Sequence, residues 1–274
     1  MLPPSAPPLL TDRKALALHR ARAGTQGLEL FLHEEAADEI QQRLSEVNRT
    51  FTAPAIVTGL PEFWQDLLPG ARIVADEDRL DLAEGAHDLV IHAMCLHWAN
   101  DPVGQLVQCR RALAPDGLFL GVLFGGQTLA ELRSALAEAE VALTGGLSPR
   151  VLPMGEIRDL GGLLQRAGLA LPVADAAVKT VHYRGLMHLV RDLRGMAETN
   201  ALAARRRAPL PRALLARAAE VYAGSFPAPD GRIRASFETI FLTGWAPHPG
   251  QQTPLRPGSA THRLADALRI PGSD

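Results

Sequence analysis

The sequence predicts an α/β protein built on a mostly parallel sheet with an antiparallel edge. From Ala53 onward, short apolar runs alternate with amphipathic segments, which is typical of a parallel sheet covered by helices. Two β-rich runs late in the chain are separated by a helical stretch, and we expect them to form the antiparallel edge. The length of 274 residues suits one large domain or two small ones.

Composition argues against several classes of protein. The net charge of −2 and the isoelectric point of about 6.5 argue against a nucleic-acid partner. Two cysteines, Cys95 and Cys109, exclude a disulfide framework and a four-thiolate zinc site. No apolar run reaches the roughly 18 to 20 residues that cross a bilayer, and residues 1–10 lack the pattern of a secretory signal. We therefore expect a cytoplasmic protein with no nucleic-acid partner and no membrane span.

The first fifty residues are predicted to be helical. Asp12 suits the cap of a helix over 13–22, and we expect this basic helix to lie on the surface. A second helix is predicted over 31–47, because apolar residues recur there on one face at helical spacing. These residues are Leu32, Ala36, Ile40, Leu44 and Val47.

The parallel part of the sheet is predicted to contain four strands. They cover residues 55–60, 72–75, 88–94 and 118–124. Pro61 suits the first turn of a short helix through residue 68, and a longer helix is expected over 102–113. The strand over 118–124 is apolar on both faces, as a central parallel strand should be.

The second half of the chain is predicted to alternate helices with the two antiparallel strands. Thr128 is expected to cap a helix through about residue 143, and Gly168 to stop a helix over 155–167. The two strands are expected over 173–183 and 234–245, where β-branched and aromatic residues gather. Residues 185–224 are expected to be mostly helical, with a break at the prolines of 209–211.

Three segments follow from this pattern. Residues 1–52 form an N-terminal helical segment, and residues 53–246 form the α/β domain with a helical insert over 185–230. Residues 247–274 are a tail rich in Pro, Gln and Gly, expected to be loosely packed until a short segment at 263–268.

Several motifs resemble one known family. The run DLVIHAMCLHW at 88–98, followed by a helix and by RALAPDG at 111–117, resembles the class I S-adenosylmethionine-dependent methyltransferases. LHWAND at 96–101, FGGQTLAELR at 124–133 and GSAT at 258–261 are similar to one branch of that superfamily. This branch includes a mitochondrial assembly factor of respiratory complex I that hydroxylates a protein arginine, together with its alphaproteobacterial relatives. The malonyl-carrier-protein methyltransferase of biotin synthesis is a further cousin.

The resemblance implies a Rossmann-like fold, S-adenosyl-L-methionine as cofactor and a respiratory-chain subunit or other protein as partner. Ligands of such sheets bind over the carboxyl ends of the strands. The family has a Gly-x-Gly-x-Gly turn after its first strand, but here the turn reads Thr-Gly-Leu-Pro-Glu-Phe, and only Gly59 remains. Pro61 removes a backbone donor and Phe63 adds a ring where glycines belong.

The nucleotide-binding half is also shorter than in the family. The segment between Leu60 and Arg72 has room for one short helix, so one strand–helix unit is missing. The strand over 72–75 resembles the family strand whose terminal acid contacts adenine, and no strand here matches the one that holds the ribose hydroxyls. We therefore predict a six-stranded sheet in which strand 72–75 pairs directly with strand 55–60 through a right-handed crossover. Asp76 would move by about 4.8 Å, one strand spacing, toward the ribose.

These departures predict weak cofactor binding. Loss of a charge-assisted pair to the ribose costs about 1.5 to 3 kcal/mol, and a clash at the turn can cost as much again. Together they would turn micromolar affinity into millimolar affinity or worse. The residues expected at this eroded cofactor site are Gly59, Asp76, Glu77, Met94, Cys95 and Leu96.

His97 and Trp98 follow the strand over 88–94 at the expected mouth of the site. His97 could act as a catalytic base and Trp98 as a pocket wall, or they could be a loop anchor and a packing residue. Cys95 has no evident basic partner, which favours a buried structural thiol over a nucleophile. His92 lies inside a strand and is expected to be a satisfied core or interface histidine.

The candidate substrate residues follow the fourth strand: Phe124, Gly125, Gly126, Glu131 and Arg133. The glycines permit either close approach of a ligand or a sharp turn. Glu131 and Arg133 face the pocket by resemblance, or lie on an exposed helix face. The nine histidines show no metal-ligand spacing, so we expect no metal site.

Three functions remain open at this point. The chain could be an S-adenosylmethionine-dependent transferase that tolerates a degenerate turn. It could be a non-catalytic relative that keeps the fold as a binding surface and assists assembly of a respiratory complex. It could also be a protein-arginine hydroxylase, which would need an oxidant that the sequence does not reveal.

Overall fold

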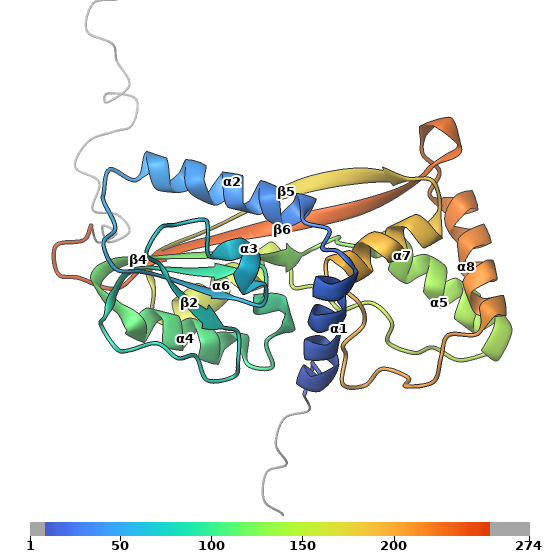
Figure 1. The fold of residues 1–274 in the computed structure, drawn as a ribbon, viewed down its shortest axis with the longest axis horizontal. Coiled ribbons are helices and arrows are strands. Elements are labelled where there is room, and N and C mark those ends of the chain that lie inside the picture. The colour runs from blue at the N-terminus through green and yellow to red at the C-terminus, as the bar shows by residue number, and fades with distance from the viewer. Residues whose placement is uncertain (1–8, 253–274) are drawn as a thin grey trace, which may run out of the picture.

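The computed structural model describes residues 9–252 and has a six-stranded mixed sheet at its centre (Figure 1). The strand order is β2-β1-β3-β4-β6-β5. The strands are β1 (Pro54–Thr58), β2 (Arg72–Ala75), β3 (His87–Ala93), β4 (Leu113–Gly125), β5 (Ala170–Tyr183) and β6 (Ile233–Trp245). The first four in the sheet are parallel, whereas β6 runs antiparallel to both β4 and β5. The predicted antiparallel edge is therefore confirmed.

The shortened sheet is also confirmed. β2 pairs directly with β1, with Ala55 opposite Arg72 and Thr58 opposite Ala75, so no strand lies between them. β1 in turn pairs with β3, where Thr58 is opposite Ala93. Because β1 pairs in parallel with both β2 and β3, the residues that follow these three strands lie at one edge of the sheet.

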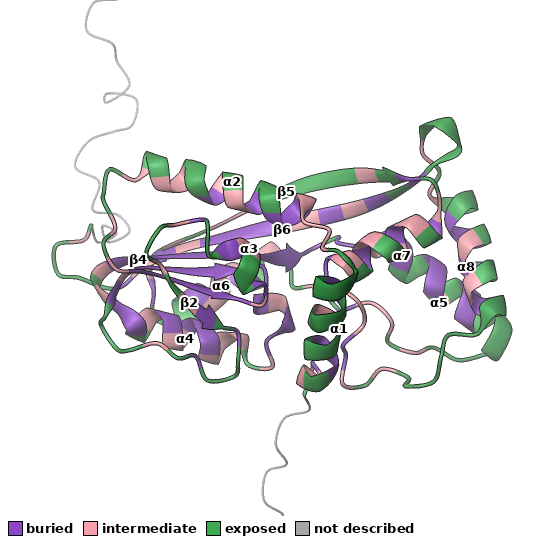
Figure 2. Ribbon diagram, viewed as in Figure 1, coloured by how far each residue is buried: buried purple, intermediate pink, exposed green. Residues whose placement is uncertain are grey.

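Side chains of the central strands alternate between two apolar clusters. Ile56, Ile91 and Leu120 face one cluster, whereas Val57 and Phe119 face the other. This alternation is the period of two that a strand imposes. Because both faces are covered, β1, β3 and most of β4 are buried, as Figure 2 shows.

Eight α-helices surround the sheet in the described part of the chain. They are α1 (Arg13–Gln26), α2 (Phe31–Glu46), α3 (Pro61–Trp64), α4 (Pro102–Ala112), α5 (Ala130–Thr144), α6 (Ile157–Arg166), α7 (Leu186–Gly195) and α8 (Arg212–Ser225). α4 and α6 share one apolar cluster with the sheet, and α2, α3, α5, α7 and α8 share the other. No helix within residues 9–252 is long and apolar enough to cross a lipid bilayer.

The last two strands extend beyond the rest of the sheet. The β4–β6 register ends where Gly125 lies opposite Glu238, whereas β5 and β6 stay paired as far as Tyr183 and Ile233. Helices α7 and α8 lie at the end of this two-stranded extension and pack beside α5 (Figure 1). The helical insert is thus held away from the parallel strands by its own pair of strands.

Two local predictions are wrong. Thr128 does not cap α5, because its hydroxyl donates to Gly125 O at 2.8 Å and accepts from Glu238 N at 2.9 Å. The helix begins after Leu129, whose φ is 55° and whose side chain makes no capping bond. The insert is less helical than expected, because residues 196–211 form a loop that starts after α7 and contains Ala197 at a φ of 61°. The expected segment at 263–268 and the GSAT motif lie outside the described residues.

Candidate functional site

The carboxyl ends of β1, β2 and β3 meet at one edge, which we call the carboxyl edge. Gly59, Asp76 and Met94 directly follow these three strands, so the paired registers place them side by side. In parallel sheets this edge is where ligands bind. It therefore gathers three of the residues that the sequence assigned to a cofactor.

Asp76 is buried, with 3% of its surface exposed, and α1 neutralises its charge. Arg20 donates from Nη1 to Oδ1 at 2.6 Å and from Nη2 to Oδ2 at 2.8 Å, a two-pronged pair. Arg13 donates to the same carboxylate at 3.2 Å and to the Asp76 carbonyl. Burial raises the pKa of Asp76, but the hydrogen bonds and charge of Arg20 outweigh it, so the pKa lies below its usual value.

Gly59 provides the space for the same guanidinium. A Cβ at this position would lie 2.1 Å from Arg20 Cζ, 2.2 Å from Nη2 and 2.6 Å from Nε. The guanidinium thus occupies the space that a side chain at position 59 would need, and glycine leaves this space free.

The spacing of residues on α1 explains why this helix lies against the carboxyl edge. Arg13, Leu16, Arg20 and Ala23 recur at three- and four-residue intervals and share one face of the helix. Leu16 and Ala23 are buried, and the two arginines on the same face reach Asp76. Most residues of this helix are exposed, as expected of a surface helix, but its buried face covers the carboxyl edge.

Two of the expected cofactor residues are in contact with Arg20. Its guanidinium lies in the space over Gly59 and pairs with the carboxylate of Asp76. Pro61 begins α3, and the Phe63 ring packs edge-on to Trp64 at a centroid distance of 5.2 Å. The turn after β1 thus leads directly into a packed helical turn.

The other expected cofactor residues are held within the protein. Cys95 Sγ lies 3.4 Å from His92 Nδ1 and 3.6 Å from Val57 O. Burial raises the pKa of the Cys95 thiol and lowers the pKa of His92 to about 4, so both are neutral at pH 7. His92 Nε2 lies 2.7 Å from Gln105 Oε1, as expected of a satisfied core histidine.

The remaining three residues differ in exposure. Met94 is buried with a φ of 51°, and Leu96 is buried at the start of a single 3₁₀ turn, Leu96–Trp98. Glu77 is exposed, and its carbonyl accepts from Gln105 Nε2 at 3.0 Å. The structure therefore brings Gly59, Asp76, Met94 and Cys95 together at the edge and leaves the Glu77 side chain outside.

His97 and Trp98 meet a residue that sequence reasoning missed, Glu198. Trp98 Nε1 donates to Glu198 Oε2 at 2.9 Å, and His97 Nε2 lies 3.2 Å from Oε1. The Phe124 backbone N–H donates to His97 Nδ1 at 3.4 Å. An Nδ1 that accepts carries no proton, so the imidazole proton lies on Nε2 and is donated to Glu198. These bonds fix the ring between β4 and the helical insert, in the manner of a loop anchor.

His33 on α2 is a second buried histidine near this cluster. Its Nδ1 accepts from Trp64 Nε1 at 3.2 Å, while its Nε2 has no partner among the described residues. Burial lowers its pKa to about 4, and the charges of Glu198 and Arg20 also act on it. Within residues 9–252, no three His, Cys, Asp or Glu side chains are arranged to hold a metal ion.

The expected substrate residues separate into two groups. Phe124 lines a cavity, described below, between the sheet and the insert. Gly125 and Gly126 allow close packing within the protein instead. A Cβ at Gly125 would lie 2.9 Å from Gly155 O, and a Cβ at Gly126 would lie 2.1 Å from a Glu238 carboxylate oxygen. Glu131 accepts from Ser236 Oγ at 2.6 Å and binds β6, and Arg133 donates to Leu152 O at 3.4 Å. These four contacts are with the protein itself.

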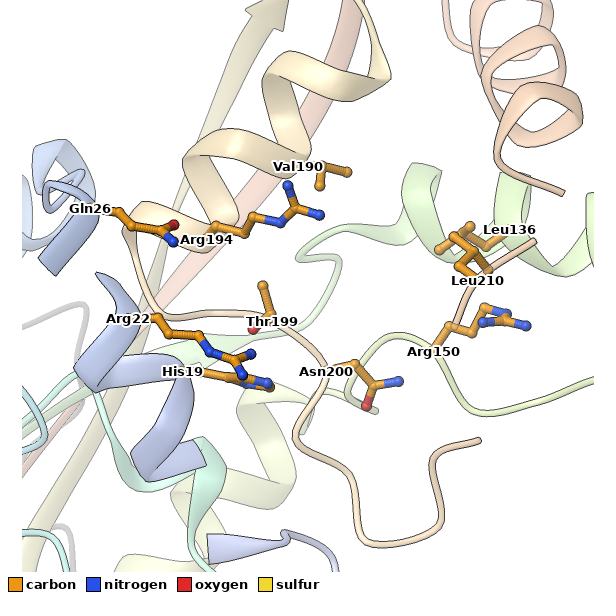
Figure 3. Close-up of a pocket in the computed structure, with 10 residues that line it drawn as sticks. All are labelled: His19, Arg22, Gln26, Leu136, Arg150, Val190, Arg194, Thr199, Asn200 and Leu210. Carbon is orange, nitrogen blue, oxygen red and sulfur yellow. The ribbon is translucent and has the colours of Figure 1, made fainter. Parts of the chain in front are cut away.

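Two adjoining cavities lie between the sheet and the helical insert. The inner one has a volume of about 130 Å³ and includes Trp98, Phe124 and Phe237 in its walls. The outer one, of about 650 Å³, includes His19 and Arg22 (Figure 3). Neither is lined by Gly59, Asp76 or Cys95, although the inner one reaches Phe124 at the carboxyl end of β4.

Comparisons with known proteins identify the family. Residues 20–121 match the family model described as a methyltransferase domain. The chain is 38% identical over 203 residues to the zebrafish (Danio rerio) "Arginine-hydroxylase NDUFAF5, mitochondrial", covering 74% of this chain and 63% of that protein. It is 30% identical over 203 residues to the malonyl-[acyl-carrier protein] O-methyltransferase of Halorhodospira halophila, covering 74% of this chain and 67% of that protein.

Among solved structures, the YcgJ protein of Bacillus subtilis matches with a TM-score of 0.49 and 11% identity, covering 78% of this chain and 99% of that one. The chain spans less than two thirds of the length of the zebrafish relative. The sequence motifs, the family model and the two relatives agree. The chain belongs to the class I S-adenosylmethionine-dependent methyltransferase superfamily, in the branch that contains the mitochondrial arginine-hydroxylase NDUFAF5.

Proposed function

We propose that this protein is a methyltransferase-fold binding protein that binds S-adenosylmethionine weakly or not at all while α1 covers the carboxyl edge. The observation that carries the proposal is the Arg20 guanidinium, which lies against Gly59 and pairs with Asp76. A cofactor would have to displace this buried ion pair before reaching either group. Pro61 and Phe63 in the turn add to that cost.

The proposed role is assistance in assembling a respiratory-chain complex through binding of one of its protein subunits. The similarity to the NDUFAF5 proteins supports this role, and so does a fold that keeps its sheet and helical insert. We propose a cytoplasmic location, although the NDUFAF5 relatives are named as mitochondrial.

Calorimetric titration with S-adenosylhomocysteine tests the proposal. We expect no binding by the wild-type protein at millimolar ligand, and micromolar binding would overturn the proposal. The double variant Arg13→Ala/Arg20→Ala separates the effect of α1 from the effect of the turn after β1. If the variant binds the ligand, the arginines of α1 prevent binding in the wild type. If the variant does not bind it, the turn prevents binding. Arg72→Ala is the matched control, because Arg72 pairs with Asp81 on the surface.

Protein-arginine hydroxylation is the second candidate. The name of the NDUFAF5 relatives favours this function. The pairing of Arg20 with Asp76 also favours it, because it shows that the carboxyl edge can hold a guanidinium. Co-expression with a respiratory-chain subunit, followed by peptide mass analysis, tests it. A mass gain of one oxygen atom on an arginine supports this function, and its absence counts against it.

A further inference from the structure

The two cavities between the sheet and the insert adjoin each other and have unlike linings. They share four lining residues: Arg150, Val190, Thr199 and Asn200. The inner cavity is enclosed by the end of β4, by α5 and by α7, whereas the outer cavity lies between α1, α7 and the loop after α7.

The inner end is apolar. Its walls include Trp98, Phe124, Leu132, Met154 and Phe237. The only acid among its lining residues, Glu198, is engaged by Trp98 and His97 and is 10% exposed. Apart from Glu198 and Arg150, the lining residues of the inner cavity carry no charge, so this end suits a short hydrocarbon chain.

The outer end is basic. Arg22 from α1 and Arg194 from α7 line it with His19, and no carboxylate does. Figure 3 shows Arg22, His19 and Arg194 on one side of the cavity and Arg150 on the other. Within residues 9–252, neither Arg22 nor Arg194 forms an ion pair. Two arginine charges therefore converge on this cavity without a protein counter-charge.

Arg150 lies where the two cavities join. Glu140, which is buried, accepts from Arg150 Nε at 2.9 Å and holds the guanidinium in place. The remaining nitrogen, Nη1, donates to no acceptor among the described residues. A fixed guanidinium at the junction would hold a polar group of a ligand that passes from the apolar to the basic end.

We infer that this cavity binds a small amphipathic anion: a ligand with a short hydrocarbon chain in the inner cavity and a carboxylate or phosphate in the outer one. Guanidinium groups pair with either anion through two parallel hydrogen bonds. Gly59, Asp76 and Cys95 line neither cavity, so the inference does not depend on whether S-adenosylmethionine binds at the carboxyl edge.

Titration with octanoate, octyl phosphate and octanol tests this inference, and calorimetry and tryptophan fluorescence measure the binding. We expect both anions to bind and octanol to bind about tenfold more weakly. If octyl phosphate binds more tightly than octanoate, the natural ligand carries a phosphate, and the reverse order indicates a carboxylate. Failure of both anions to bind at millimolar concentration, or equal binding of octanol, overturns the inference.

Variants locate the ligand. Arg22→Gln/Arg194→Gln is expected to weaken binding of both anions about tenfold and leave octanol unchanged. Val190→Trp, which fills the junction, is expected to weaken all three ligands. The control Arg158→Gln/Arg166→Gln removes the same charge from exposed positions of α6 and should have no effect. Circular dichroism checks that both cavity variants are folded. If these folded variants bind the anions as tightly as the wild type does, the ligand binds elsewhere and the inference is overturned.

Discussion

The carboxyl edge and the cavity beneath the helical insert have opposite characters. At the edge, a buried aspartate is matched by two arginines of the same chain, and Arg20 fills the space over Gly59. In the cavity, neither Arg22 nor Arg194 forms an ion pair with another residue of 9–252, and the inner walls are mostly apolar. One helix, α1, supplies both Arg20 and Arg22. The comparison indicates that the chain pairs its own charges at the carboxyl edge, whereas two arginines beside the insert have no ion-pair partner among the described residues.

Asp76→Ala should have the largest effect, because it leaves Arg20 mostly buried without a carboxylate. Removing one partner of a buried ion pair costs about 3 to 5 kcal/mol of unfolding free energy. Urea unfolding followed by circular dichroism measures the loss. Asp81→Ala is the control, since this side chain is 90% exposed in its pair with Arg72, and it should cost less than about 1 kcal/mol. Equal losses would mean that the edge is not the closed site described above.

Gly59→Ala tests the close approach of the guanidinium. The new Cβ would lie 2.1 Å from Arg20 Cζ and push the guanidinium off Asp76. We expect a loss of about 2 to 3 kcal/mol in unfolding free energy, the worth of charge-assisted hydrogen bonds. Gly24→Ala on α1 meets no atom within 4 Å and should leave stability unchanged or raise it by up to about 1 kcal/mol. A tolerated alanine at 59 would contradict the position of Arg20.

Glu140→Gln sharpens the comparison from the cavity side through acid sensitivity. Hydrogen bonds from Arg150 lower the pKa of Glu140 from 4.5 to about 2. A carboxyl group whose pKa is lower in the folded than in the unfolded protein stabilises the folded state at pH values above the unfolded pKa. This contribution to stability is lost as the pH falls from about 4.5 toward 2. The wild type should therefore lose about 2 kcal/mol more than the variant between pH 5 and pH 2. Urea unfolding across this range measures it, and parallel curves would contradict it.

Glu198→Gln is expected to have the smallest effect. The amide oxygen can still accept from Trp98, so the variant loses the charge but keeps one hydrogen bond. We expect a loss of about 1 kcal/mol, seen as a slightly lower melting temperature. Glu198→Leu removes the acceptor as well and should cost more. If both variants melt like the wild type, the cluster does not hold the insert to the sheet.

The sheet could be predicted because its signals are local. Buried apolar runs mark β1, β3 and β4, and the short segment between Leu60 and Arg72 forces β2 to pair with β1. Element ends were harder to predict. Thr128 looks like a helix cap, but a hydrogen bond across to Glu238 competes for its hydroxyl.

The site was less predictable, because its contacts join distant segments. Asp76 could be chosen from its place after a strand, but its partner Arg20 lies 56 residues away. The sequence contains part of the signal for this pairing, because Arg13 and Arg20 share a helix face with the apolar Leu16. Glu198 gave no signal, because it lies in a loop that was expected to be helical.

The two outer strands of the sheet would meet another strand very differently. β2 has only four residues, and short edge strands resist edge-to-edge pairing. β5 has fourteen residues, most of them exposed or half-buried, and β6 is its only partner within the described chain. Its outer row of peptide groups is the one long backbone ladder left open in this part of the molecule. Any strand exchange or strand addition by this protein would therefore take place along β5, far from the short edge that loss of a strand created.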